Sequence, residues 1–214
     1  MDSKQHNTTV YNQHAKAYLH KFLDFDLYHD TYDSLLSMLP LNATVLELGC
    51  GPGNVVRYFL QKRPDLQITG IDLAPEMIRQ AEKTNPNATF QILDIRDAGA
   101  IQEKFDAVAG TFCLPYLSYE DLDLFFGNLK SLTKENGIIY ISCMEGPPER
   151  SGFEKTSFTG DDELYITYYE RGAIEARLSE NGFLTEMFFT KAYPETDGSV
   201  TTDLIYIARK GVAF

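Results

Sequence analysis

Residues 45–54 are Val45-Leu46-Glu47-Leu48-Gly49-Cys50-Gly51-Pro52-Gly53-Asn54, a short apolar run followed by three glycines at alternate positions. The apolar run is typical of a buried strand, and a helical pattern begins at Asn54. A strand, a glycine loop and a helix in this order bring the backbone very close to a nucleotide-like ligand, because glycine has no side chain to hold the ligand away. The stretch therefore predicts a ligand-binding loop at the end of a buried strand.

The chain has 214 residues and a formal net charge of −12, which limits the partners it can have. An acidic surface disfavours general binding to nucleic acid, because Lys and Arg must neutralise the phosphates. No apolar stretch approaches the ~18–20 residues that span a bilayer, and the N-terminus lacks the apolar region of a signal peptide. We therefore expect a single cytoplasmic domain, a monomer or a homodimer, that binds neither nucleic acid nor membranes.

Cysteine and histidine spacing gives no sign of a metal site. The chain has three cysteines far apart in sequence and without CxxC spacing, Cys50, Cys113 and Cys143. We expect small buried thiols of a reducing compartment rather than zinc ligands. The four histidines lack i, i+4 spacing on one clear helix face, and we expect surface or lid positions for His6, His14, His20 and His29.

Apolar runs alternate with helical patterns through the first two thirds of the chain, which predicts a parallel sheet covered by helices. The expected strands are Thr44–Leu48, Gln67–Ile71, Thr89–Leu93, Phe105–Gly110 and Ile138–Cys143. The expected helices between them are Asn54–Arg63, Pro75–Thr84 and Glu120–Thr133, the last stopped by Asn136-Gly137.

The two ends of the chain follow other patterns. Gly and Pro residues predict a long loop over Glu145–Asp162, followed by an extra strand at Glu163–Tyr169 and a helix at Arg171–Asn181. Turn residues between Leu184–Ala192 and Thr201–Ala208 predict an antiparallel hairpin. At the N-terminus, the i, i+4, i+7, i+11 spacing of Tyr11, Ala15, Tyr18 and Phe22 predicts one face of a helix that could cover the ligand. A second helix is expected over about 27–39.

Acidic residues lie near the ends of three successive predicted strands. Glu47 lies inside the first strand, Asp72 closes the second and Asp94 closes the third. Ligands of open parallel sheets bind beyond the carboxyl ends of the strands, and an acid after the second strand can accept both ribose hydroxyls. We expect Asp94 within reach of an adenine amino group, and Glu47 to hold the glycine loop or a ligand ammonium group through water.

A nicotinamide dinucleotide site is the first alternative. Its fingerprint is GxGxxG, in which the third glycine allows the helix to pack closely on the strand. Here that position is Asn54, and the observed spacing is GxGxG. A dinucleotide site also makes no special use of an acid inside the first strand, so the pattern argues against it.

Taken together, four stretches resemble the motifs of class I S-adenosylmethionine-dependent methyltransferases. They are residues 45–54, Gly70-Ile71-Asp72-Leu73-Ala74-Pro75-Glu76-Met77-Ile78, Gln91-Ile92-Leu93-Asp94-Ile95-Arg96-Asp97, and Phe105-Asp106-Ala107-Val108 with Leu114-Pro115-Tyr116-Leu117. The C-terminal hairpin also matches, and the resemblance extends from about Tyr11 to the end. It implies an α/β three-layer sandwich with a seven-stranded, mostly parallel sheet of order 3-2-1-4-5-7-6, the last two strands forming the antiparallel hairpin.

The resemblance also implies S-adenosyl-L-methionine as cofactor and S-adenosyl-L-homocysteine as product. It divides the chain into an N-terminal helical lid (1–40), a cofactor-binding core (41–143), a substrate-side loop and extra strand (144–170), and a C-terminal helix and hairpin (171–214). The cofactor-binding residues it implies are Tyr11, Tyr18, Glu47, Gly49, Cys50, Gly51, Asp72, Leu73, Met77, Asp94, Ile95, Thr111 and Phe112. For Tyr11 and Tyr18, packing in the core of an amphipathic helix is an equal alternative.

The expected reaction is in-line displacement, in which an acceptor oxygen, nitrogen, sulfur or carbon attacks the sulfonium methyl group. Much of the catalysis can come from alignment and exclusion of water, and a base is needed only for a protonated, weakly acidic acceptor. Candidates for that base by position alone are His14, Tyr116 and Glu145.

The methyl acceptor is less well determined. Methyltransferases that act on amino groups of bases or glutamine usually carry Asn/Asp-Pro-Pro-Tyr/Phe after the fourth strand, where this chain has Cys113-Leu114-Pro115-Tyr116. A small-molecule acceptor is therefore the first hypothesis and a protein side chain the second. A regulatory protein that binds the cofactor without turnover is the third.

Overall fold

The first strand shows why the sheet must be covered on both faces. The computed structural model describes residues 2–156, 158, 160–195 and 197–211. In β1 (Thr44–Leu48), Leu46 and Leu48 enter one hydrophobic cluster and Val45 enters another on the opposite face. Successive side chains of a strand point to opposite faces, so a strand with apolar side chains on both faces needs packing partners on both.

The strands form one seven-stranded sheet of order β3-β2-β1-β4-β5-β9-β8. β2 (Gln67–Asp72), β3 (Thr89–Ile92), β4 (Phe105–Gly110) and β5 (Thr133–Met144) are parallel to β1. β9 (Val200–Lys210) pairs antiparallel with β5 and with β8 (Phe183–Pro194), forming the expected C-terminal hairpin. The predicted fold class and strand order are confirmed.

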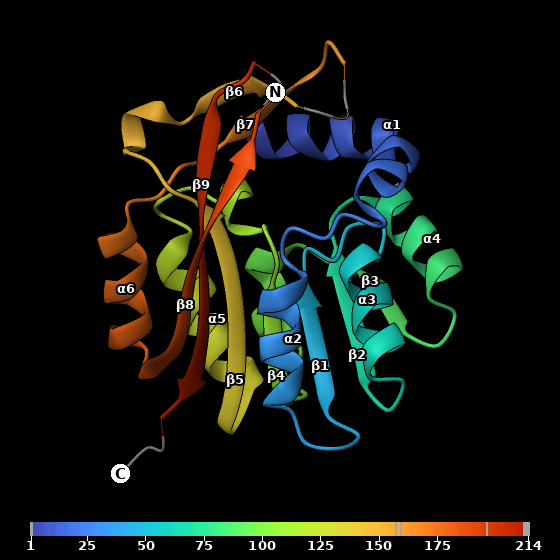
Figure 1. Ribbon diagram of the computed structural model, residues 1–214, viewed down its shortest axis with the longest axis vertical. Helices are drawn as coiled ribbons and strands as arrows, with labels where there is room; N and C mark the ends of the chain where they lie inside the picture. The colour runs from blue at the N-terminus through green and yellow to red at the C-terminus, as the bar shows by residue number, and fades with distance from the viewer. Residues whose placement is uncertain (1, 157, 159, 196, 212–214) are drawn as a thin grey trace.

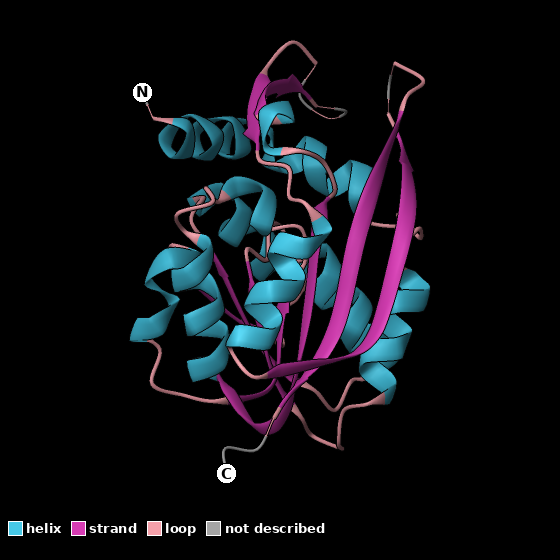
Figure 2. Ribbon diagram, turned by 90° about the vertical axis from the view of Figure 1, so that its left-hand side faces the viewer, coloured by secondary structure: helices cyan, strands magenta, loops and turns pink. Residues whose placement is uncertain are grey.

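Helices cover both faces of this sheet (Figures 1 and 2). On one face α2 (His29–Ser37) and α3 (Asn54–Lys62) contribute Leu35 and Phe59 to a cluster with Val45. On the other face α5 (Leu122–Leu132) and α6 (Arg171–Glu180) contribute side chains to the cluster that contains Leu46 and Leu48 of β1. α4 (Pro75–Thr84) contacts β2 and β3. No helix within the described residues is long and apolar enough to cross a membrane.

A layer above the carboxyl ends of the parallel strands completes the molecule (Figure 1). It consists of α1 (Ser3–Phe22) and a separate antiparallel pair, β6 (Gly152–Lys155) with β7 (Glu163–Ile166). α1 packs against both α4 and β7. Short 3₁₀ turns connect the layers: η1 (Ile95–Ala100), η2 (Leu114–Tyr116) and η3 (Pro148–Arg150).

The prediction of a long loop over Glu145–Asp162 was wrong in part, because this segment contains η3 and β6. The Phe153 ring meets the Tyr165 ring of β7 at 5.3 Å, and this cross-strand pair gives β6 its partner. A four-residue strand among Gly and Pro residues has too little alternation to be recognised without that partner.

The helix before β5 ends within one residue of its predicted end at Thr133, but the predicted stop signal was wrong. α5 ends at Leu132, before Asn136-Gly137, and the Asn136 backbone has a positive φ of 61° inside β5. Lys210 of β9 donates hydrogen bonds of 2.9 Å to the carbonyls of Lys130 and Thr133. A side chain distant in sequence therefore satisfies carbonyls at the helix end.

Candidate functional site

The glycine loop turns the chain sharply from β1 into α3. Gly49, Gly51 and Gly53 all have positive φ, between 52° and 79°, which residues with a Cβ rarely adopt. The Cys50 amide donates a 2.9 Å hydrogen bond to the carbonyl of Ile71 in β2, which ties the loop to the neighbouring strand. The N-terminus of α3 begins immediately after the loop, so its free amide groups lie at the same edge of the sheet.

Asp72, at the end of β2, holds the loop from the other side. One carboxylate oxygen accepts from the Gly51 amide at 2.9 Å and the other from the Ala74 amide at 2.8 Å. The sequence interpretation offered this role to Glu47, but it belongs to Asp72. Burial raises the pKa of Asp72 to about 6, against the lowering effect of the two amides, so the carboxylate is ionised at neutral pH.

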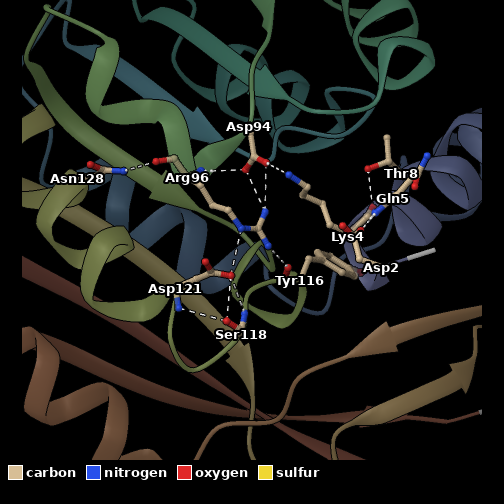
Figure 3. Close-up of polar contacts among 10 residues, drawn as sticks. All are labelled: Asp2, Lys4, Gln5, Thr8, Asp94, Arg96, Tyr116, Ser118, Asp121 and Asn128. Atoms are coloured by element: carbon tan, nitrogen blue, oxygen red, sulfur yellow. Dashed lines mark hydrogen bonds and ion pairs between the residues drawn. The ribbon is translucent and has the colours of Figure 1, made fainter.

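Asp94 lies in an ion-pair network that connects η1 to the N-terminal helix (Figure 3). Its carboxylate accepts from the Arg96 guanidinium at 3.0 Å and lies 3.5 Å from the Lys4 ammonium of α1. Arg96 also donates to Asp121 and to the backbone carbonyl of Tyr116, both at 3.1 Å. The Arg96 backbone amide also donates to the Asp94 carboxylate at 3.0 Å, so these contacts already use most of its acceptor sites.

Glu47 is completely buried in the sheet yet is only half satisfied. Its Oε1 accepts a 2.7 Å hydrogen bond from the Thr111 hydroxyl, and its Oε2 has no partner among the described residues. Burial raises the pKa of Glu47 to about 8, the Thr111 hydrogen bond lowers it, and the charge of Asp72 raises it further. A buried carboxyl oxygen without a partner is costly, and its position suggests a positively charged or hydrogen-bond-donating ligand.

We expect Glu47→Gln to make the ligand-free protein more stable at pH 8 than the wild type. A carboxyl group whose pKa is raised in the folded state keeps its proton while the unfolded chain releases it. The wild type therefore loses stability as the pH rises from about 4.5 to about 8. Gln is neutral throughout, and since one pKa unit is about 1.4 kcal/mol, we expect a melting temperature at least ~2 °C above the wild type at pH 8.

The check is thermal unfolding of both proteins at pH 5 and pH 8, with the exposed Glu103→Gln as control. The difference between Glu47→Gln and the wild type should nearly vanish at pH 5, and Glu103→Gln should show none at either pH. A lower melting temperature of Glu47→Gln at pH 8 would contradict the assigned cause.

Two neighbouring cavities of about 110 and 160 Å³ lie at this edge of the sheet. All of the predicted cofactor residues except two line the smaller cavity: Tyr11, Tyr18, Gly49, Gly51, Asp72, Leu73, Met77, Asp94, Ile95, Thr111 and Phe112. The remaining two, Glu47 and Cys50, line the larger cavity. The cavities share part of their walls, including Gly51, Thr111 and Tyr116, so a ligand in one lies beside a ligand in the other.

Aromatic rings from α1 form the roof over both cavities. The Tyr11 ring lies 5.8 Å from the Tyr18 ring, 5.3 Å from the Tyr116 ring and 5.7 Å from the Phe158 ring. The hydroxyls of Tyr11 and Tyr116 are hydrogen-bonded to each other. Tyr11 and Tyr18 therefore line the cavities and also pack against other side chains of the interior. A role in cofactor binding and a role in core packing do not exclude each other.

Of the three candidate bases, Tyr116 alone lines the cavities. Burial raises its pKa to about 12, so the phenol keeps its proton near neutral pH. His14 pairs with Asp162 at 2.7 Å, away from both cavities, and Glu145 lines neither. The geometry thus favours none of them as a base.

α2 and β9 form one side of the larger cavity, and none of the residues predicted for the site lies on it. Asp203 is buried there, accepts a 2.7 Å hydrogen bond from the Tyr28 hydroxyl, and leaves its Oδ1 without a partner among the described residues. One signal could have found it. β9 runs antiparallel, so its first residues must lie at the carboxyl edge of the parallel strands. The sequence shows an acid, Asp203, within that mostly apolar strand.

The cysteines and histidines form no ligand set in the described part of the chain. All three cysteines are free and buried, and burial raises the pKa of the Cys50 thiol well above its usual value. The described residues contain no group of three or more His, Cys, Asp or Glu that could hold a metal ion.

The proteins that this chain is similar to are methyltransferases. Residues 45–137 match the family model for the methyltransferase domain. The chain is 35% identical over 111 residues to trans-aconitate 2-methyltransferase of Escherichia coli, covering 50% of this chain and 42% of that protein. It is 32% identical over 116 residues to the malonyl-acyl-carrier-protein O-methyltransferase of Acetivibrio thermocellus, covering 51% and 40%. The chain thus spans less than half the length of these relatives.

A solved structure extends the likeness to nearly the whole chain. Magnesium protoporphyrin IX methyltransferase from Synechocystis PCC 6803, solved with bound S-adenosylmethionine, superposes with a TM-score of 0.70 and 17% identity over 99% of this chain and 98% of that one. At this identity the likeness concerns the fold. Residues 45–137 are therefore similar to the methyltransferase domain, and the chain has the Rossmann-like fold of the class I S-adenosylmethionine-dependent methyltransferases, as its motifs predicted.

Proposed function

We propose that the protein transfers a methyl group from S-adenosylmethionine to a small-molecule acceptor by in-line displacement. The observation that carries the cofactor assignment is the buried, unpartnered Oε2 of Glu47 beside the glycine loop. An α-ammonium group of a methionine moiety is the kind of donor this oxygen lacks. The carboxylate of Asp72 retains lone pairs for ribose hydroxyls, and the aromatic rings above the loop suit a sulfonium.

The chain's own residues can supply alignment and exclusion of water. The bound cofactor supplies a methyl group already activated by the positive charge on sulfur. The layer of α1, β6 and β7 covers the cavities, and Tyr11 and Phe158 limit the access of water to the space beside the loop. No side chain is assigned as a base, because alignment and dehydration account for much of such a displacement.

A small acceptor is favoured by the setting of the larger cavity. It lies beneath α1 and next to the hairpin of β6 and β7 rather than on an open face, which suits a small ligand better than a folded protein surface. The name of one relative, which specifies trans-aconitate, agrees with a small acceptor. A cytoplasmic location belongs to the same proposal.

The test is a thermal-shift comparison of S-adenosylmethionine, S-adenosylhomocysteine and NADH. A ligand at 100 times its dissociation constant adds about 2.7 kcal/mol, which is roughly 5–10 °C for a domain of this size. We expect this shift with both adenosyl compounds and none with NADH. No shift with either adenosyl compound would refute the proposal. Release of S-adenosylhomocysteine in a substrate screen then separates an enzyme from a regulatory binding protein.

A further inference from the structure

Asp203 is a second buried carboxylate that the cofactor does not explain. It lies near the start of β9, opposite Met144 at the carboxyl end of β5, and only 1% of its surface is exposed. Tyr28 satisfies Oδ2, while Oδ1 has no partner within the described part of the chain. The residue lines the larger cavity and is absent from the lining of the smaller one.

Asp203 is too far from Glu47 to share one ligand group with it. The sheet order places β4 and β5 between β1, which carries Glu47, and β9. Three spacings between neighbouring strands amount to roughly 14 Å. Each carboxyl group therefore needs its own partner, and an ammonium group held by Glu47 cannot also reach Asp203.

The side chains near Asp203 are mostly aromatic. The Tyr28 ring, whose hydroxyl binds Asp203, lies 4.9 Å from the Phe112 ring and 5.8 Å from the Phe25 ring. Tyr193 lies 5.9 Å from Phe25, and all four rings line the larger cavity. Ring faces beside a carboxylate attract cations and offer little to anions.

Acidic residues outnumber basic ones among the charged side chains that line the larger cavity. Besides Glu47 and Asp203, the described lining includes Glu154 and Glu195. Its one lysine, Lys155, lies 3.4 Å from the Asp161 carboxylate. A carboxylate acceptor such as those named for the relatives would enter this cavity with little compensating positive charge.

We propose that the methyl acceptor is a small molecule with an ammonium group, and that Asp203 binds this group among the rings of Tyr28, Phe112, Phe25 and Tyr193. The inference rests on the proposed methyl transfer and names its substrate class. Burial raises the pKa of Asp203 to about 7, with the Tyr28 hydrogen bond acting in the opposite direction. A cation beside the group would favour its ionised form.

The test compares amines with neutral and anionic molecules of similar shape. Isothermal titration calorimetry at pH 7.5 measures phenethylamine, 2-phenylethanol and phenylacetate, then 1,4-diaminobutane, 1,4-butanediol and succinate, with and without saturating S-adenosylhomocysteine. At least one amine should bind tenfold or more tightly than both of its counterparts. In Asp203→Asn this preference should fall to within twofold, whereas the exposed control Asp24→Asn should keep it.

Several outcomes would overturn the inference. One is a panel in which no amine is preferred by the wild type, and another is an Asp203→Asn protein that still prefers amines. If Asp203→Asn fails to fold, Tyr28→Phe provides a second variant: it keeps the ring and the carboxylate and should keep the amine preference. Absence of S-adenosylhomocysteine binding would instead refute the cofactor proposal, and the titrations without it still test the acceptor site.

Discussion

Asp72→Ala is expected to weaken binding of S-adenosylhomocysteine by at least ~100-fold while the protein stays folded. Hydrogen bonds to a charged group contribute about 1.5–3 kcal/mol each, and a factor of ten in affinity is about 1.4 kcal/mol. Loss of two ribose hydrogen bonds therefore accounts for a hundredfold change. Alanine also removes the acceptor that fixes the Gly51 amide, so the loop itself loses its fixed position.

The effect on stability should be small in comparison. Asp72 is half-buried, and desolvation raises its pKa to about 6, so its removal relieves the cost of a desolvated charge while it forfeits two hydrogen bonds to backbone amides. We expect the melting temperature of the ligand-free protein to change by no more than roughly 2–4 °C, the equivalent of about 1 kcal/mol.

Calorimetric titration with S-adenosylhomocysteine measures the affinity, and Asp97→Ala is the matched control. Asp97 is an exposed acid of η1, close to the same edge of the sheet, and its removal should leave the affinity unchanged. An Asp72→Ala protein that binds within tenfold of the wild type would show that the acid after β2 is only a loop anchor.

The sequence predicted those parts of the fold whose signals are local. Thr44–Leu48 and Phe105–Gly110 have the predicted bounds because each is a short, mostly apolar run that ends at or just before a glycine, and Pro75 marks the start of α4 correctly. Elements that depend on a distant partner were missed. β6 exists because β7 lies beside it, and Lys210, which satisfies carbonyls at the end of α5, is too distant in sequence for a local signal.

The same distinction holds for the candidate site. The glycines and Asp72 follow strand ends directly, so a linear pattern is enough to group them. Asp203 belongs to the last strand, and only the antiparallel pairing with β5 brings it to the carboxyl edge. Likewise, no sequence spacing indicates that Lys4 of the first helix meets Asp94. The contact between Lys4 and Asp94 was therefore beyond a linear pattern, whereas Asp203 could have been placed from the predicted antiparallel strand.

Gly51→Ala and Gly53→Ala are expected to impair different properties, ligand affinity and stability respectively, although the two glycines lie two residues apart in one loop. At both positions φ is positive, 52° and 79°, so a Cβ costs about 1–2 kcal/mol in each. At position 53 the new Cβ would also lie 2.4 Å from the Asn85 amide nitrogen and 3.2 Å from the Ala81 Cα of α4. At position 51 the nearest atom is a ring carbon of Tyr18 at 3.9 Å.

Gly53→Ala should therefore lose stability, because Asn85 must give up its 2.8 Å hydrogen bond to the Gly53 carbonyl and α3 must move away from α4. We expect a loss of about 2–4 kcal/mol, and a melting temperature lower by at least roughly 5 °C. Gly51→Ala should lose only the cost of its backbone conformation. Its methyl group, however, would stand at the shared wall of the two cavities, and we expect S-adenosylhomocysteine to bind at least ~10-fold more weakly.

Thermal unfolding of the ligand-free proteins and calorimetric titration together separate the two effects. Gly127→Ala is the control, because this exposed glycine of α5 has no atom within 4 Å of the position of a new Cβ, and alanine in a helix should stabilise by about 0.5–1 kcal/mol without changing affinity. If Gly51→Ala bound S-adenosylhomocysteine like the wild type, close approach of ligand to this backbone would be excluded. If Gly53→Ala were as stable as the wild type, the third glycine would not be required for the packing of α3 on α4. We expect Gly51→Ala to lower mainly the affinity for S-adenosylhomocysteine and Gly53→Ala to lower mainly the stability. That result would show that the second glycine is needed for ligand binding and the third for helix packing.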